Sequence, residues 1–167
     1  MIILLSRHGE SEYNVQNRIG GDPDLSSKGI VYSEKLSNFV EKNKWFPKKI
    51  FRSKKKRTIQ TSSKIDSWIC NKYSYSELNE INAGIAENLT FEEFSKNYPE
   101  EQNKRKLNKL EYKYPGGESY LDLISRTSKL CKSILEKNED VFIISHQAIT
   151  RVLLYHFLKY DINKIPH

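Results

Sequence analysis

Residues 141–147 read VFIISHQ: an uninterrupted apolar run at 141–144 leads through Ser145 to His146. Such a run, without polar alternation, is typical of a strand buried on both faces of a parallel sheet. A similar run, IILLSRHG, lies at residues 2–9 and also ends in a histidine. We expect strands at residues 2–6, 50–53, 73–77 and 141–145.

Segments with helical spacing lie between these strands. The clearest follows Pro115-Gly116-Gly117, where apolar residues recur at three- and four-residue steps from Leu121 to Leu135. The other helices are expected at residues 28–41, 54–68 and 148–158. This alternation predicts an α/β fold with a mostly parallel central sheet flanked by helices, in a single domain over residues 1–167. The polar segment 79–114 is expected to form short helices and loops that cover one edge of the sheet as a lid.

The composition narrows the class of partner. The chain has 28 Lys plus Arg and 21 Asp plus Glu, a net charge of +7, but the basic residues are dispersed and no nucleic-acid motif accompanies them. No apolar run approaches the roughly 20 residues of a membrane helix. Cys70 and Cys131 lack the spacing of a thiolate metal site or a disulfide framework. We therefore expect a cytoplasmic protein with no nucleic-acid or membrane partner.

Three of the expected strands deliver polar side chains to one edge of the sheet. The first leads into Arg7 and His8, the second into a helix that carries Arg57, and the last into His146. The carboxyl ends of parallel strands form the crevice in which ligands bind, so these side chains are expected to lie together. Two guanidinium groups and a second imidazole around His8 suit the oxygens of a phosphoryl group in transfer.

Further motifs extend this pattern along the chain. They are RHGE at 7–10, RIGGD at 18–22, KRTIQT at 56–61, LNEINAG at 78–84, YPEE at 98–101, YKYP at 112–115, GESY at 117–120 and HQA at 146–148. In this order they resemble the histidine phosphatase superfamily, and within it the bisphosphatase half of the 6-phosphofructo-2-kinase/fructose-2,6-bisphosphatases. The resemblance implies a phosphoglycerate mutase-like fold and covers almost the whole sequence.

The resemblance also implies an activity and a set of site residues. The activity is removal of the C2 phosphate of fructose 2,6-bisphosphate through a phosphohistidine on His8, with Glu80 protonating the sugar oxygen and water then releasing phosphate. The residues that hold the transferring phosphoryl group are Arg7, Asn14, Arg57 and His146, and neither a metal nor another cofactor is required. By the same resemblance, the residues that bind the sugar and its C6 phosphate are Arg105, Lys109, Tyr120, Gln147, Arg151 and the backbone at Gly20. Arg105 and Lys109 are four residues apart, so one helical face is expected to present both.

Departures from the family pattern leave alternatives open. Phe91 stands where a tyrosine hydroxyl usually touches substrate phosphate, Lys55 where an apolar residue is usual, and Asn82 where an aspartate is usual. The first departure keeps a broad-specificity sugar-phosphate phosphomonoesterase as an alternative, and a catalytically weak phosphate-binding or regulatory module as another. A mutase is disfavoured because the segment between Glu80 and His146 resembles the bisphosphatase lid.

The ends of the sequence raise the question of other partners. The relatives continue beyond the position of His167 into another strand, so the expected sheet lacks that final strand. No phosphate loop of a kinase occurs in the sequence. The resemblance therefore implies, besides the sugar bisphosphate, either a kinase domain upstream in the native gene product or a second copy of the chain as partner.

Overall fold

The central layer is a parallel sheet. A computed structural model describes residues 1–44, 47–65, 71–159 and 161–167. The strands are β1 (Ile3–Arg7), β2 (Lys49–Ser53), β3 (Asn71–Tyr75) and β4 (Val141–Ser145). All pair in parallel, in the order β1-β4-β2-β3. The predicted α/β fold with a parallel sheet is therefore confirmed.

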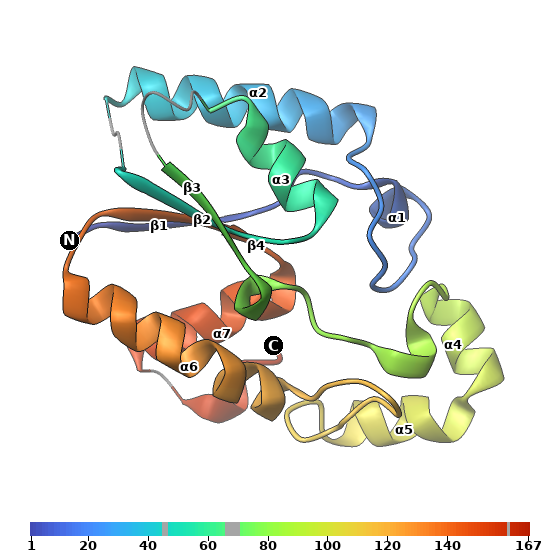
Figure 1. Ribbon diagram of the computed structural model, residues 1–167. Coiled ribbons are helices and arrows are strands. Elements are labelled where there is room, and N and C mark those ends of the chain that lie inside the picture. Colours follow the sequence, from blue (N-terminus) through green and yellow to red (C-terminus); the bar gives the residue numbers. More distant parts are fainter. Residues whose placement is uncertain (45–46, 66–70, 160) are drawn as a thin grey trace.

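Helices cover both faces of this sheet. The helices α2 (Ser27–Lys42) and α3 (Lys56–Ser63) lie on one face, and α6 (Tyr120–Lys137) and α7 (Gln147–Leu158) lie on the other (Figure 1). The shorter elements are α1 (Glu12–Val15), α4 (Phe91–Asn97), α5 (Pro99–Leu107) and the 3-10 turns η1 (Ser76–Leu78), η2 (Gly84–Ala86) and η3 (Ile162–Lys164). Among the described residues, no helix has both the length and the apolar character needed to cross a membrane.

The strand β4 supplies the centre of the core, because every one of its residues is buried. Phe142 and Ile144 pack with Ile50 in the cluster that also includes Val40 of α2, whereas Ile143 joins the cluster that contains residues of α6 and α7. Burying one side chain of this size stabilises the fold by about 1.5 to 3 kcal/mol. The apolar run at 141–144 thus holds both helical layers on the sheet.

The helix α6 begins and ends where local chemistry favours it. The Ser119 hydroxyl accepts a hydrogen bond from the Asp122 amide, the Asp122 carboxylate accepts one from the Ser119 amide, and Asn138 closes the helix at a φ of 49°. The predicted apolar stripe is too broad, because Leu121 and Leu135 are each 41% exposed. These two positions lie at the margins of the buried face.

One predicted helix and one predicted strand differ from the structure by two residues or more. The helix expected at 54–68 begins at Lys56, since Lys55 has an extended backbone and its amide donates to the Ser53 hydroxyl. Residues 66–68 of that prediction, and Cys70, lie outside the described residues. The strand expected at 73–77 ends at Tyr75, because the next residues turn into η1.

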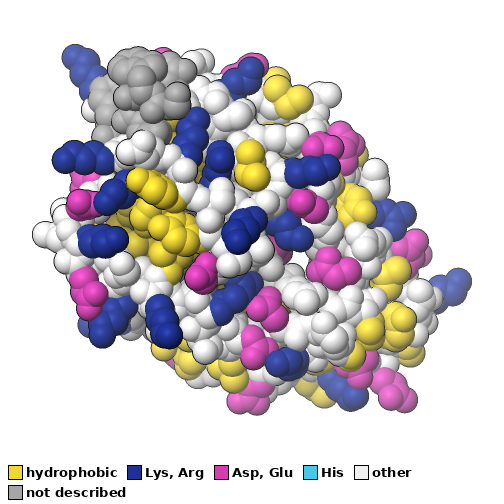
Figure 2. All heavy atoms as spheres, in the orientation of Figure 1, with side chains coloured by type: hydrophobic (Ala, Val, Ile, Leu, Met, Phe, Trp, Pro, Cys, Tyr) yellow, Lys and Arg dark blue, Asp and Glu magenta, His cyan; other side chains and the backbone are white. Residues whose placement is uncertain are grey.

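The segment 79–114 forms the short helices and loops that were predicted. It carries α4 and α5 beyond the carboxyl ends of the strands (Figure 1). Phe94 and Tyr114 are buried there with Ala83 and Ala86 in a small cluster of their own. Figure 2 shows Lys and Arg spread over the viewed face and mixed with Asp and Glu, in agreement with the dispersed charge of the sequence.

Candidate active site

The register of β1 and β4 brings two histidines together. Arg7 pairs with Ser145, and the next residue in each strand direction is a histidine. The His8 amide donates to the Ser145 carbonyl at 2.9 Å, and the His8 and His146 ring centroids are 5.1 Å apart. Both side chains are buried. Sheet geometry therefore produces the pair of imidazoles that the sequence predicts.

His8 is arranged as a nucleophile. Its Nδ1 lies 2.6 Å from the Gly9 carbonyl oxygen, which can only accept, so Nδ1 carries the proton and Nε2 keeps its lone pair. Arg57 donates from Nε to this Nε2 at 3.2 Å. Burial, followed by the charge of Arg57, lowers the pKa of His8 from 6.5 to about 3, against the opposing Gly9 hydrogen bond. The imidazole is thus neutral at neutral pH, and its Nε2 electron pair, which accepts from Arg57, is not taken up by a proton.

His146 holds a buried polar atom with no partner. Its Nε2 lies 2.8 Å from the Ser53 hydroxyl, whereas its Nδ1 makes no hydrogen bond in the described part of the chain. Burial, and then the charge of Arg57, lowers the pKa of this imidazole well below its usual value. When the Ser53 hydroxyl donates to Nε2, Nδ1 carries the proton and is a free donor. In that tautomer the buried Nδ1 donor is free to bind an anion.

Arg57 is the buried cation of the site, with only 3% of its surface exposed. One Nη1 donates to the Gly21 carbonyl at 3.0 Å and lies 4.0 Å from the Asp22 carboxylate. Burial lowers its pKa, but a guanidinium stays charged in proteins. Arg7 is exposed, and its charge adds to the lowering of both histidine pKa values.

Asn14 has a structural task that the sequence did not predict. Its side-chain oxygen accepts hydrogen bonds from the Ser11 amide at 3.0 Å and the Ser11 hydroxyl at 3.1 Å, so it closes the capping box of α1. The side-chain amide group remains as a donor. In the described part of the chain, no hydrogen bond joins Asn14 to His8 or Arg57. Its role as a phosphoryl ligand therefore stays a prediction.

Glu80 follows η1 and brings a carboxyl group beside the cationic centre. One of its oxygens accepts from the Ile81 amide at 2.9 Å, and the Ala148 amide at the start of α7 is a second donor. Burial raises the pKa of the carboxyl above 4.5, and this effect outweighs the opposing hydrogen bonds and the charges of Arg57 and Arg7. A carboxyl with a raised pKa is suited to proton transfer.

A cavity of about 430 Å³ extends from Glu80 toward the lid. Five of the six predicted substrate-binding residues line it: Arg105, Lys109, Tyr120, Gln147 and Arg151. The Arg105 Nε donates to the Tyr114 hydroxyl at 2.7 Å, and Arg151 donates to the Tyr120 hydroxyl at 3.3 Å. Phe91 lies at the rim, and its ring centroid is 5.8 Å from the Arg105 guanidinium carbon. Three cations on one wall favour a second anionic group.

The prediction that one helical face presents both Arg105 and Lys109 is wrong. The helix α5 ends at Leu107, with Asn108 as its C-cap at φ −148°. Lys109 therefore reaches the cavity from the turn that follows, and not from the helical face that carries Arg105. The two cations meet through the return of the chain, which a four-residue spacing alone does not predict.

Gly20 does not line the 430 Å³ cavity. It sits at φ +68°, and a Cβ there would lie 2.1 Å from a carboxylate oxygen of Glu87. The neighbouring Gly21 amide donates to this carboxylate at 2.6 Å. The glycine pair thus lets Glu87 approach the loop whose carbonyl holds Arg57, and direct substrate contact at Gly20 stays a prediction.

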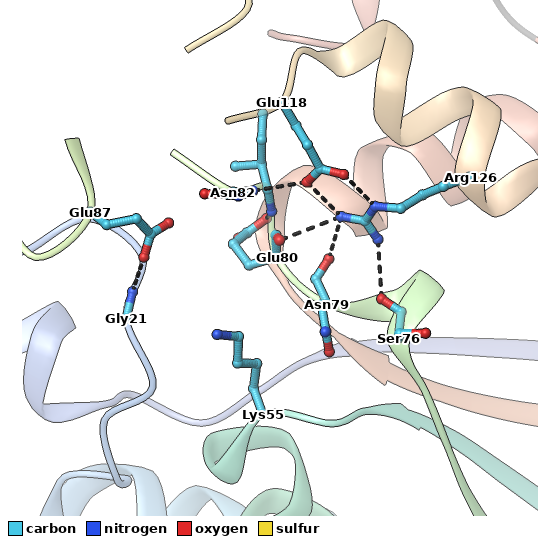
Figure 3. A pocket seen from close by; sticks show the side chains of 10 residues that line it. Gly21, Lys55, Ser76, Asn79, Glu80, Asn82, Glu87, Glu118 and Arg126 are labelled. Carbon is cyan, nitrogen blue, oxygen red and sulfur yellow. Dashed lines mark hydrogen bonds and ion pairs between the residues drawn. The ribbon is translucent and has the colours of Figure 1, made fainter. Parts of the chain in front are cut away.

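A second cavity, of about 540 Å³, shares Glu80 with the first (Figure 3). Lys55 and Asn82, both departures from the family pattern, line it. Arg126 and Glu118 lie opposite Lys55 in this view and point toward each other. Sequence reasoning missed this pair. The GESY motif contained Glu118, but a separation of eight residues to Arg126 is not a helical ion-pair spacing.

Among the described residues, no group of three or more His, Cys, Asp or Glu side chains is arranged to hold a metal ion. The charged groups around His8 are the arginines. The arrangement supplies a neutral imidazole, a buried guanidinium, a free imidazole donor and a carboxyl of raised pKa. These groups suit the transfer of a phosphoryl group.

Comparison with known proteins agrees with this chemistry. The profile of the histidine phosphatase superfamily (branch 1) matches residues 3–167. The chain is 43% identical over 169 residues to 6-phosphofructo-2-kinase/fructose-2,6-bisphosphatase 3 of Rattus norvegicus, covering 99% of this chain and 29% of the relative. It is 44% identical over 166 residues to 6-phosphofructo-2-kinase/fructose-2,6-bisphosphatase of Arabidopsis thaliana, covering 98% of this chain and 22% of the relative. The chain thus spans less than a third of the length of these relatives.

Solved structures share the fold. Alpha-ribazole phosphatase from Shigella flexneri superposes with a TM-score of 0.89 at 19% identity, covering 100% of this chain and 84% of that one. YhfR of Bacillus stearothermophilus superposes with a TM-score of 0.87 at 24% identity, covering 98% of this chain and 82% of that one. With the profile match over nearly all of its length, the chain belongs to branch 1 of the histidine phosphatase superfamily.

Proposed function

We propose that residues 1–167 form one catalytic domain that removes the C2 phosphate of fructose 2,6-bisphosphate, giving fructose 6-phosphate and phosphate. The observation that carries the proposal is the position of Glu80. Its carboxyl is acted on by the charges of Arg57 and Arg7 at the reaction centre, and it lines the cavity that holds three further cations. A substrate with two phosphates places one anion in each region, with its sugar oxygen beside the carboxyl.

The first step is transfer to His8. The neutral Nε2 attacks phosphorus and the bond from phosphorus to the sugar oxygen breaks. Glu80, in its protonated form, gives its proton to that oxygen, so the sugar leaves as an alcohol. The Arg57 donor that lies against Nε2 moves to the phosphoryl oxygens, and the His146 Nδ1 donor finds its partner there.

The second step is hydrolysis of the phosphohistidine. The Glu80 carboxylate takes a proton from water as the water oxygen attacks phosphorus, and the bond from phosphorus to Nε2 breaks. Phosphate leaves, His8 returns to its neutral form and Glu80 to its protonated form. Both steps use the same carboxyl, which stays within the site because amides of Ile81 and Ala148 hold it.

A second candidate function is supported by one observation. Phe91 is half exposed at the rim of the cavity and offers no hydroxyl to a phosphate. A pocket with fewer directed hydrogen bonds discriminates less between sugar phosphates. This favours, as the alternative, a phosphomonoesterase of broad specificity on the same catalytic groups.

Phosphate release tests the proposal directly. Fructose 2,6-bisphosphate, fructose 6-phosphate, 3-phosphoglycerate and an aryl phosphate are compared, with His8→Ala as control. Selective release from the bisphosphate that vanishes in the control is expected. Similar rates on several substrates would favour the broad phosphomonoesterase. Saturable binding of the bisphosphate without release, by a folded protein, would favour a binding module.

A further inference from the structure

The segment that carries Glu80 has little structure of its own. Only the 3-10 turn η1 (Ser76–Leu78) precedes it, and residues 79–83 belong to no helix or strand. A carboxyl that transfers a proton must be held within a fraction of an ångström of its productive position. The groups that hold this segment therefore matter for the reaction.

Arg126 of α6 is hydrogen-bonded to backbone carbonyls on the N-terminal side of Glu80. Its guanidinium donates to the Glu77 carbonyl at 2.5 Å and the Asn79 carbonyl at 2.8 Å. Longer contacts of 3.4 Å reach the carbonyls of Ser76 and of Glu80 itself. One side chain thus fixes the last turn before the carboxyl and the residue that bears it.

Glu118 holds the other side of the same segment. Its carboxylate accepts from the Asn82 amide at 2.9 Å, and its own amide donates to the Asn82 carbonyl at 2.8 Å. It also accepts from Arg126, at 2.8 Å from Nε and 3.1 Å from Nη2 (Figure 3). The pair thereby joins both ends of the short span that contains Glu80.

The geometry requires a guanidinium. Arg126 uses Nε and both terminal nitrogens in one plane, toward the Glu118 carboxylate and toward the carbonyls of Glu77 and Asn79. A lysine ammonium on a flexible stem cannot reproduce that fork. The Arg126 and Glu118 side chains are only 22% and 24% exposed, so water replaces these bonds poorly.

We infer that Arg126 and Glu118 are positioning residues for proton transfer by Glu80. This inference rests on the proposed function, in which Glu80 protonates the leaving oxygen. Arg126 and Glu118 touch neither the phosphoryl group nor the sugar in that scheme. Their loss displaces the carboxyl while His8, Arg57 and His146 stay at the carboxyl edge of the sheet.

The leaving group distinguishes positioning from a general structural role. A sugar oxygen needs a proton to leave, whereas nitrophenolate leaves without one. A displaced Glu80 therefore slows the first step, transfer to His8, with the sugar phosphate and spares that step with 4-nitrophenyl phosphate, whereas hydrolysis of the phosphohistidine is the same for both substrates. Damage to the fold or to the phosphoryl site slows both.

The experiment compares the first-step rates of Arg126→Lys, Glu118→Gln and Glu80→Gln, measured in single turnovers with enzyme in excess, as release of fructose 6-phosphate from the sugar bisphosphate and of nitrophenolate from 4-nitrophenyl phosphate. Arg18→Lys is the matched control, because Arg18 also bonds a glutamate (Glu93, 3.3 Å) and a backbone carbonyl (Asn88, 2.6 Å) but not residues 76–82. Thermal unfolding of each variant establishes that it is folded.

For Arg126→Lys we expect the first-step rate on the sugar bisphosphate to fall about 10- to 100-fold, with less than about a threefold change in the first-step rate on 4-nitrophenyl phosphate. Glu118→Gln should show the same selectivity with a smaller loss, and Arg18→Lys should change neither rate. The double variant that combines Arg126→Lys with Glu80→Gln should react with the sugar bisphosphate little more slowly than Glu80→Gln alone.

Equal losses of the first-step rate on both substrates in folded Arg126→Lys and Glu118→Gln, or no loss on either, would overturn the positioning role while leaving the proposed function intact. A wild-type protein that releases phosphate from neither substrate would overturn the proposed function and this inference together.

Discussion

The reaction centre and the sugar cavity are built in different ways. His8, His146 and Arg57 are buried, and each follows directly from a strand or the first turn after one. Arg105 and Lys109 are half-buried and come from a short helix and the turn behind it. One region is part of the sheet's own framework, and the other lies on a segment added beyond its edge.

This difference in construction predicts that the reaction centre sets the rate and that the sugar cavity sets the selectivity. Burial keeps His8 neutral and aligns the cations before substrate arrives, so the centre needs little rearrangement during reaction. Long side chains at the rim of an open cavity lose more conformational freedom on binding and are better screened by water. We therefore expect substitutions in the centre to act on kcat, and those in the cavity to act on KM.

The largest effect is expected from His8→Ala. Without the nucleophile no phosphohistidine forms, so kcat should fall by at least about 10⁴-fold. Acid-quenched protein incubated with labelled substrate reports the phosphoenzyme. His156→Asn is the control, since His156 lies on α7 and bonds the Thr127 hydroxyl at 3.0 Å. Phosphoenzyme in the His8→Ala protein would place the nucleophile elsewhere.

Glu80→Gln should lower kcat on the sugar bisphosphate by about 10²- to 10⁴-fold. The wild-type pH profile gives a second test. Activity should be lost as pH rises through the raised pKa of Glu80, because the acid must be protonated, and this limb should vanish in Glu80→Gln.

On the acid side, activity should persist well below pH 6.5, because His8 protonates only near its pKa of about 3. An acid limb at 6.5 would contradict the burial of the nucleophile. Glu77→Gln is the control for Glu80→Gln, because the nearby Glu77 carboxylate accepts a hydrogen bond from the Ser76 hydroxyl and does not line the 430 Å³ cavity.

Arg105→Ala should raise KM for the bisphosphate about tenfold, the loss of one charge-assisted contact, with kcat changed less than about threefold. Lys104→Ala is its control on the same helix, where Lys104 is paired with Glu101 and does not line the cavity. A fall in kcat at constant KM would remove the distinction between the two regions.

The smallest effect is expected from Phe91→Tyr. A hydroxyl at the rim of the cavity adds one donor for an anion, and because the ring is half exposed the gain should be modest. KM for the bisphosphate should fall about twofold to fivefold, without change for an aryl phosphate. Phe39→Tyr, on the exposed side of α2, should change neither value. Equal gains on both substrates would argue against a second-phosphate subsite.

Much of the fold follows from local sequence. The apolar run at 141–144 predicts a doubly buried strand because water is excluded from both of its faces, and the structure places β4 there. The start of α6 follows from the Ser119 cap, which needs only residues three apart. The strand β3 lies at 71–75, two residues before the predicted 73–77, because residues 76–78 form the turn η1, which Arg126, distant in sequence, holds through the Glu77 carbonyl.

By itself, the sequence determined the parallel sheet, the order of its elements and the edge at which His8, Arg57 and His146 meet, because periodicity and strand direction are local properties. Only the tertiary structure decided the burial that sets the pKa values of His8 and Glu80, and the route by which Lys109 joins Arg105. It alone joined Arg126 to the Glu80 segment. The pKa values and these contacts depend on which residues, distant in sequence, exclude water or share hydrogen bonds, and the spacing of residues along the chain does not encode those neighbours.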